Sequence, residues 1–225
     1  MKTLTYSLIL SLSVPFSSMA QNVINWRNFD AHHVIQLHGG MENGYVLGLG
    51  YGYRLPLKRN VLVSADYSFP TGKQLFDDFK VRLGGQGEVV QWKNWSASLR
   101  VYAIFRRYEN QFATLSDFGS EFSVVAGYAR RRWQLMGEFG FDKAISTKIR
   151  NSEVMKGFYP EIKDGWYVPT GGYFFYGFQS SVTIGRSDVF VRAGKLASQD
   201  FEATLNFPLY LKVGLNYRFG LVDGK

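Results

Sequence analysis

The sequence predicts an all-β protein: a transmembrane antiparallel up-and-down β-barrel of about ten strands, with eight as the alternative. The clearest observation is the run from Tyr210 to Phe219, in which apolar residues alternate with polar residues or glycine. A period of two gives a strand two unlike faces. The pattern recurs along most of the chain, behind a segment with the features of an export signal. This combination is typical of outer-membrane barrels with an apolar exterior and a polar lumen.

Residues 1–20 predict a cleaved secretory signal peptide. Lys2 supplies a positive charge, Leu4 to Phe16 a short apolar core, and Ser18-Met19-Ala20 a small-x-small cleavage site. The apolar core is shorter than the roughly 20 residues that a spanning helix needs. We expect residues 21–225 to form a single outer-membrane barrel domain. The chain has no cysteine, which excludes disulfides, thiol chemistry and a lipid anchor on cysteine.

The composition agrees with a barrel and argues against two other classes of protein. Aromatic residues are abundant, with 14 Tyr, 19 Phe and 5 Trp, yet the mean hydropathy is only −0.14. A helical membrane protein would have a strongly positive value, whereas half of each barrel strand faces a polar lumen. The net charge of +8 is compatible with nucleic-acid binding. For an exported chain we expect no nucleic acid, and assign the charge to lipopolysaccharide phosphates or to lumen ion pairs.

Five candidate strands lie in the N-terminal half of the chain. The first, Ala31 to His38, is short. The second, Tyr45 to Leu55, alternates large apolar residues with glycine, and the third, Asn60 to Phe69, alternates apolar residues with serine and aspartate. The fourth, Phe79 to Val90, and the fifth, Trp95 to Arg106, set apolar residues against charged and polar ones. Each pattern predicts a strand with one lipid-facing and one lumen-facing side.

Five more candidates follow in the C-terminal half. They span Phe118 to Ala129, Trp133 to Asp142, Tyr173 to Ile184, Asp188 to Lys195 and Tyr210 to Phe219. The prolines after the signal fall in expected turns, loops or strand boundaries, where the missing backbone donor does no harm. Tryptophan and tyrosine near several strand ends predict interfacial aromatic girdles, at Tyr45, Trp92, Trp95, Tyr108 and Trp133.

Short and long connections alternate between these strands. Turn-like connections are expected at residues 56–59, 91–94, 130–132 and 185–187, and longer ones at 39–44, 70–78, 107–117, 143–172 and 197–206. Outer-membrane barrels have short periplasmic turns and long extracellular loops. An even number of strands then places both ends of the barrel in the periplasm. Arg130-Arg131-Arg132, in one such turn, is expected to be solvated or to bind anionic headgroups or a periplasmic partner.

The chain resembles small bacterial outer-membrane β-barrel proteins of the OmpA/OmpX-like or porin-like superfamily. The resemblance rests on the closing run Val213-Gly214-Leu215-Asn216-Tyr217-Arg218-Phe219 and covers residues 31 to 220 as an architecture. In those families, an aromatic-ended last strand is the signal read by the barrel-insertion machinery. Here six residues follow Phe219, which departs from that pattern. The resemblance implies a location in the outer membrane and leaves the function open.

The expected lumen face is rich in charge. A barrel of about eight strands is only just wide enough for side chains to fill, so these groups could pair into a plug. Alternatively, they could line a narrow, weakly anion-preferring pore. The candidate lumen charge network comprises Arg54, Asp66, Lys80, Arg82, Glu88, Arg100, Arg106, Glu121, Glu138, Asp142, Arg192, Lys212 and Arg218.

The longest expected loop, residues 143–172, carries four aromatic residues among charged ones: Phe158, Tyr159, Trp166 and Tyr167. Aromatic residues on a long loop predict either a surface that binds a partner or a lid packed over the barrel mouth.

Three functions are compatible with these features. The first is a structural or accessory barrel that binds surface ligands or other envelope proteins through its loops. The second is a narrow diffusion channel for ions or small solutes. The third is a lipid-modifying enzyme built around His38, which could face the lumen or lie at the outer rim, where such an enzyme would place its base. No catalytic, cofactor or metal site can be assembled from the sequence, because no acid or serine motif accompanies the three histidines, and the adjacent His32 and His33 would point to opposite faces.

Overall fold

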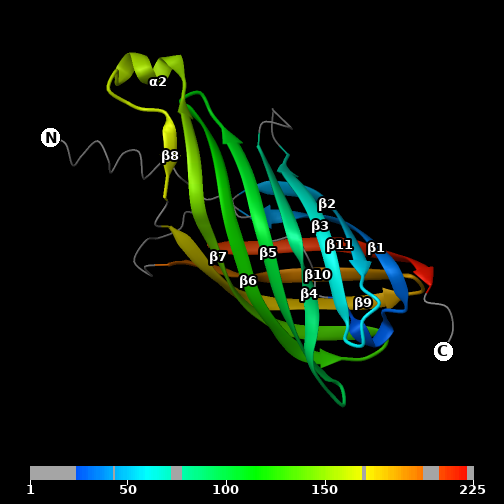
Figure 1. Cartoon of the computed structure of the whole chain (residues 1–225). Coiled ribbons are helices and arrows are strands. Elements are labelled where there is room, and N and C mark those ends of the chain that lie inside the picture. Colours follow the sequence, from blue (N-terminus) through cyan, green and yellow to red (C-terminus); the bar gives the residue numbers. More distant parts are fainter. Residues whose placement is uncertain (1–23, 43, 72–77, 169–170, 200–207, 222–225) are drawn as a thin grey trace.

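The computed structural model describes residues 24–42, 44–71, 78–168, 171–199 and 208–221. The predicted signal peptide lies outside these residues. The described chain is dominated by one antiparallel sheet that closes on itself (Figure 1). A short 3-10 helix, η1 (Trp26–Asn28), precedes the sheet, and a short helix, α2 (Glu153–Phe158), interrupts it. No helix in the described ranges is long and apolar enough to cross a membrane.

Ten strands form the barrel wall, and each pairs with the next along the chain. Their bounds are β1 (Ala31–Glu42), β2 (Tyr45–Arg54), β3 (Val61–Pro70), β4 (Phe79–Trp92), β5 (Trp95–Glu109), β6 (Ala113–Ala129), β7 (Trp133–Asn151), β9 (Gly172–Ile184), β10 (Ser187–Ser198) and β11 (Leu209–Leu221). β1 pairs with β11, from Ala31 opposite Leu221 to Glu42 opposite Tyr210, and this pairing closes the ring. The prediction of a ten-stranded antiparallel barrel is confirmed.

The alternation in sequence becomes an alternation in burial. Along β2, exposed and buried residues alternate from Tyr45 to Tyr53, with tyrosine and leucine outside and glycine inside. On β5, Leu99 and Val101 are exposed on the outer face, whereas Arg100 and Tyr102 are buried within the barrel. Apolar side chains outside and charged ones inside reverse the arrangement of a soluble protein. The structure is therefore that of a transmembrane barrel.

Aromatic side chains form two belts on the barrel exterior. One follows Phe69, Tyr67, Phe79, Phe105, Phe118 and Trp166, each ring within 6 Å of the next by centroid. At the other end of the strands, Trp95, Tyr128 and Trp133 pack together, as do His33, Tyr53 and Phe219. Trp95 and Phe105 are ten residues apart on β5, about 33 Å along a strand and about 25 Å in height at a tilt of about 40°. That height matches the apolar band of an outer-membrane barrel.

We call the end of the barrel that carries Ala31 and Leu221 the terminal end and the opposite end the loop end. The four connections predicted to be short lie together at the terminal end. In the β9–β10 turn, Gly185 has a φ of 60°, which glycine adopts without steric cost.

Several strands extend further toward the loop end than the sequence predicted. β1 continues to Glu42, β5 and β6 reach Glu109 and Ala113, and β7 runs to Asn151. The register shifts between Phe118 and Gly119 of β6, where Ala144 and Ser146 of β7 are the consecutive partners. Such a bulge inverts the alternation, so that Asp142 and Thr147 both face inward. The alternation of apolar and polar residues is therefore interrupted in the sequence after Asp142, although the strand continues to Asn151.

The predicted long loop between β7 and β9 contains α2 and a three-residue strand, β8 (Gly165–Tyr167), that pairs with Thr147 to Ile149 of β7. Together they extend the β6–β7 hairpin beyond the barrel wall (Figure 1). We refer to residues 152–168 as the flap.

Candidate functional site: a charged lumen closed by the N-terminal segment

Three groups of ion pairs are stacked along the lumen. The group nearest the loop end is centred on Asp142 of β7. Its carboxylate pairs with Arg106 of β5 and with Lys80 of β4 at 3.3 Å, and it accepts a hydrogen bond of 2.9 Å from the hydroxyl of Tyr173 of β9. One carboxylate thereby connects four strands.

The central group contains three carboxylates. Glu138 of β7 pairs with Arg100 at 2.8 Å and with Arg192 at 2.6 Å, and it accepts a hydrogen bond of 2.6 Å from Tyr210. On the opposite wall, Asp66 of β3 pairs with Arg82 at 3.0 Å. Arg82 also reaches Glu121 of β6 at 3.5 Å. All of these ionic side chains are almost completely buried, so each charge depends on its partners for stabilisation.

The third group lies at the terminal end and ties the barrel to the segment before β1. Arg218 of β11 pairs with Asp30 at 3.0 Å and with Asp188 of β10 at 3.5 Å. Arg54 of β2 donates to the backbone oxygen of Phe29 at 2.6 Å.

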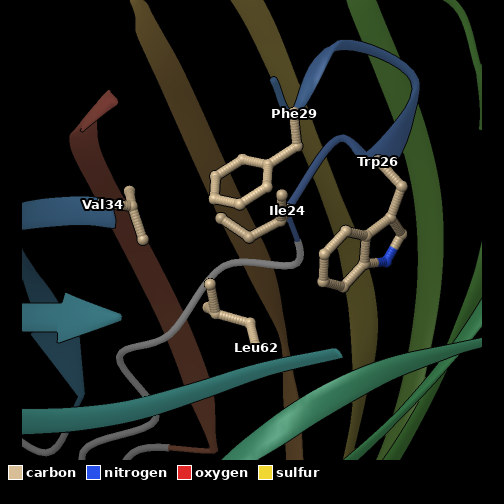
Figure 2. Packing of buried hydrophobic residues seen from close by; sticks show 5 residues of the cluster. All are labelled: Ile24, Trp26, Phe29, Val34 and Leu62. Atoms are coloured by element: carbon tan, nitrogen blue, oxygen red, sulfur yellow. The ribbon is translucent and has the colours of Figure 1, made fainter. Parts of the chain in front are cut away.

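Residues 24–30, which we call the inner segment, lie inside the terminal end of the barrel. Ile24, Trp26 and Phe29 pack with Val34 of β1 and Leu62 of β3 (Figure 2). The indole nitrogen of Trp26 donates to Ser98 of β5 at 3.0 Å, and the side-chain amide of Asn25 donates to the backbone oxygen of Arg130 at 2.8 Å. Residues from opposite walls of the barrel thus hold the segment across the lumen. Its apolar residues were present in the sequence, but without the barrel no pattern showed that they would pack inside it.

Not every polar atom in the lumen is paired with another side chain. Gln36 Nε2, both ring nitrogens of His38, Ser181 Oγ and Asn216 Oδ1 are buried and make no hydrogen bond among the described residues. Buried polar groups of this kind are usually satisfied by water. Gln36 and His38 lie opposite Gly50 and Gly48 of β2, where the wall has no side chains. The sequence had left His38 in the lumen or at the outer rim, and the structure places it in the lumen, with Nδ1 3.8 Å from Asp66 Oδ2.

The structure brings the thirteen predicted charge-network residues to the inner side of the barrel wall. Eleven are buried, and Arg54 and Glu88 are half-buried near the terminal end. Among the buried ionic residues described, seven are basic and five, including Asp188, are acidic. Sequence reasoning placed Tyr102 on the inner face of its strand, but it missed Asp188, the inner segment, Tyr173 and Tyr210, and the inward position of these two tyrosines was hidden by their aromatic character.

The four aromatic residues predicted on the long loop lie on or beside the flap and are exposed: Phe158, Tyr159, Trp166 and Tyr167. Trp166 stacks near Phe118 on the barrel exterior, and the amine of Lys148 lies 5.6 Å from its ring centroid.

No family model and no curated protein matches the chain. Similar solved structures include KdgM porin in complex with disordered oligogalacturonate, at 10% identity with a TM-score of 0.43, and KdgM porin, at 9% identity with a TM-score of 0.42. Each alignment covers 83% of this chain and 99% of the porin. The fold described above rests on the strand pairing of this chain, and neither the ligand nor the activity of those porins is transferred to it.

Proposed function

We propose that this protein is an integral outer-membrane barrel that acts as a narrow channel for small anionic solutes, and that the described conformation is its closed state. The observation that carries the proposal is the three groups of ion pairs that follow one another along the lumen from the loop end to the terminal end. A barrel with a purely structural role could be filled with apolar side chains at lower desolvation cost. The excess of buried basic residues favours anions.

Two features account for closure. The ion pairs of Glu138 connect β7 with β5 and β10 at mid-height, and Asp66 pairs with Arg82 on the neighbouring strand. The inner segment crosses the terminal end. Side chains of His38, Gln36 and Leu62 fill the space beside the glycines of β2. Displacement of the inner segment, which packs against Leu62, would free space along this wall, where the polar atoms of Gln36 and His38 that lack a hydrogen-bond partner could bind water.

Single-channel recording in planar bilayers tests the proposal. The mature chain should be closed most of the time, and a Trp26→Ala/Phe29→Ala variant should open more often, with preference for chloride over potassium. Phe158→Ala, which removes an exposed aromatic residue far from the lumen, is the matched control. If both the wild type and the double variant stay silent while their heat-modifiable mobility shows a folded barrel, the channel proposal is wrong.

The proposal includes export and orientation. We infer that residues 1–20 are removed during secretion and that the terminal end faces the periplasm, since barrels carry their short turns on that side. Lipopolysaccharide would then surround the loop end, and the barrel-insertion machinery would place the chain in the membrane. N-terminal sequencing of protein from the outer-membrane fraction should begin near Gln21.

A second candidate function is partner binding through the flap. Phe158 is 70% exposed and Trp166 is 57% exposed, and large exposed aromatic residues are common in binding surfaces. Replacement of residues 153–163 by a short turn should spare the barrel, because β7 pairs with β9 from Trp133 to Lys143. Envelope proteins or surface ligands that cross-link to the wild type should then be lost; unchanged cross-linking would reject this function.

The structure removes the geometric basis for the enzyme hypothesis. A base that acts on membrane lipid must reach the barrel exterior, but the side chain of His38 is buried in the lumen beside Asp66. We therefore do not propose lipid hydrolysis.

A further inference from the structure

A cavity of about 480 Å³ opens at the terminal end of the barrel. Its lining residues come from the inner segment, the β4–β5 connection and the β6–β7 turn: Trp26, Arg27, Gln91, Asn94, Ala129, Arg130 and Arg131. A volume of this size falls within the usual range for small-molecule sites. The cavity is separate from the ion pairs at mid-lumen.

The lining is basic without a compensating acid. Three of the lining residues are arginines, and none is an aspartate or glutamate. The nearest acidic side chains by position in the fold are engaged elsewhere: Asp30 pairs with Arg218, and Glu88 accepts hydrogen bonds from Asn60 and Ser96. The cavity therefore has a positive potential that nothing among the described residues neutralises.

Arg27 distinguishes this cavity from an ordinary basic surface. Its Nε and Nη2 atoms are buried and make no hydrogen bond to any described residue. A buried charged donor without an acceptor is costly. A guanidinium group offers two parallel donors that match the oxygens of a carboxylate or phosphate. Arg27 lines the cavity, and a rotation of its side chain would bring these two donors to an oxyanion there.

The site is built from segments that the fold holds together. The side chain of Asn25 accepts from the backbone nitrogen of Arg27 at 3.2 Å and donates to the backbone oxygen of Arg130 at 2.8 Å. The guanidinium of Arg130 lies over the ring of Tyr128, 5.7 Å from its centroid. These contacts fix the inner segment against the β6–β7 turn before any ligand arrives, which lowers the entropic cost of binding.

We propose that this cavity binds a soluble oxyanion that carries a phosphate or carboxylate group, with Arg27 as the central ligand and Arg131 as its partner at the rim. The site goes beyond the proposed channel, since binding at the terminal end requires no conduction. A lipid headgroup carries the same phosphate or carboxylate group. The experiment below distinguishes a headgroup from a soluble oxyanion.

Isothermal titration calorimetry on the refolded mature chain in a neutral detergent, at low ionic strength, tests the proposal with inorganic phosphate and citrate as probes. At least one probe should bind with a Kd of about 1 mM or tighter. Arg27→Gln should weaken binding about tenfold or more, because it removes charge-assisted hydrogen bonds. Arg131→Gln should weaken it less. The matched control is Arg59→Gln, an exposed arginine in another terminal-end turn, and it should bind as the wild type does.

Three outcomes would contradict the proposed oxyanion site. Arg27→Gln could bind as well as the wild type, Arg59→Gln could lose as much affinity as Arg27→Gln, or neither probe could bind. A further arm repeats the measurement with phosphatidylglycerol in mixed micelles. Binding of this lipid alone, with no response to phosphate or citrate, rejects the soluble ligand in favour of a headgroup. As the folding control, each variant should show the heat-modifiable electrophoretic mobility of a folded barrel.

Discussion

Glu138 illustrates what a single residue does in this lumen. Its carboxylate is buried and has three partners, Arg100, Arg192 and Tyr210, which come from β5, β10 and β11. The sequence identified Glu138 as inward-facing from the alternation of β7. It could not identify the partners, because the distance between strands around a barrel is not encoded in their spacing along the chain.

Glu138→Gln should destabilise the barrel strongly. The substitution leaves two buried guanidinium groups without their shared carboxylate, and the loss of one partner of a buried ion pair costs about 3–5 kcal/mol. Urea unfolding of the refolded barrel in detergent measures the change. Glu109→Gln is the control, since Glu109 pairs with Arg107 at 2.6 Å in a half-exposed position, where a pair contributes about 1 kcal/mol or less. Equal losses for both variants would contradict the role assigned to the Glu138 cluster.

At the scale of elements, the strands were easier to predict than their ends. β2 and β5 keep a period of two throughout and were located to within a few residues. β7 was cut short because its bulge inverts the inward and outward positions after Asp142. α2 is only six residues long and depends on Ser152, whose side chain accepts from the backbone nitrogen of Met155. A helix this short has no periodicity that a sequence could reveal.

The flap should loosen in acid. Asp164 accepts hydrogen bonds from the backbone nitrogen of Asn151 at 2.8 Å and from its side-chain amide at 2.9 Å. These hydrogen bonds, the backbone one first, hold the pKa of Asp164 below its usual value. A lowered pKa in the folded state means that the contact stabilises the flap above about pH 4, and that this stabilisation is lost as the pH falls through the folded pKa.

The measurement is the NMR signal of the Asn151 amide during acid titration, with exchange protection of residues 165–167 followed in parallel. Both should change as Asp164 is protonated. Asp164→Asn, which cannot ionise, should remove the titration. A signal that stays constant in the wild type to about pH 2, well below the ordinary pKa of aspartate, would show that the carboxylate does not hold the flap.

At the scale of the whole molecule, the barrel depends on its surroundings being apolar. Outward leucines and valines of every wall strand are exposed in the isolated chain, and a bilayer covers this area. The aromatic belts at the two ends of the strands mark where that bilayer meets water. The same arrangement would make the protein insoluble in water.

Leu99→Arg should impair insertion. Leu99 lies on the outer face of β5, between the belt residues Trp95 and Phe105, and an arginine at mid-bilayer in a barrel costs about 2–4 kcal/mol. Folding into lipid vesicles at increasing urea concentrations measures the change in the free energy of insertion. Leu57→Arg is the control, because Leu57 is similarly exposed but lies in the β2–β3 connection. Equal effects of the two substitutions would argue against the membrane position assigned to the band.

The sequence by itself predicted the barrel class, about ten strands with eight as the alternative, and most of the charged side chains that face the lumen, because a pleated strand sends alternate residues to opposite faces whatever its neighbours are. Only the tertiary structure decided how the lumen is filled. It paired Glu138 with Arg100 and Arg192, placed His38 beside Asp66, and brought Arg27 to Arg130 and Arg131. Those contacts join residues far apart in the chain, and ring closure between β1 and β11 sets which walls face each other. The inner segment depends on the same closure, since its apolar side chains pack only inside a completed barrel.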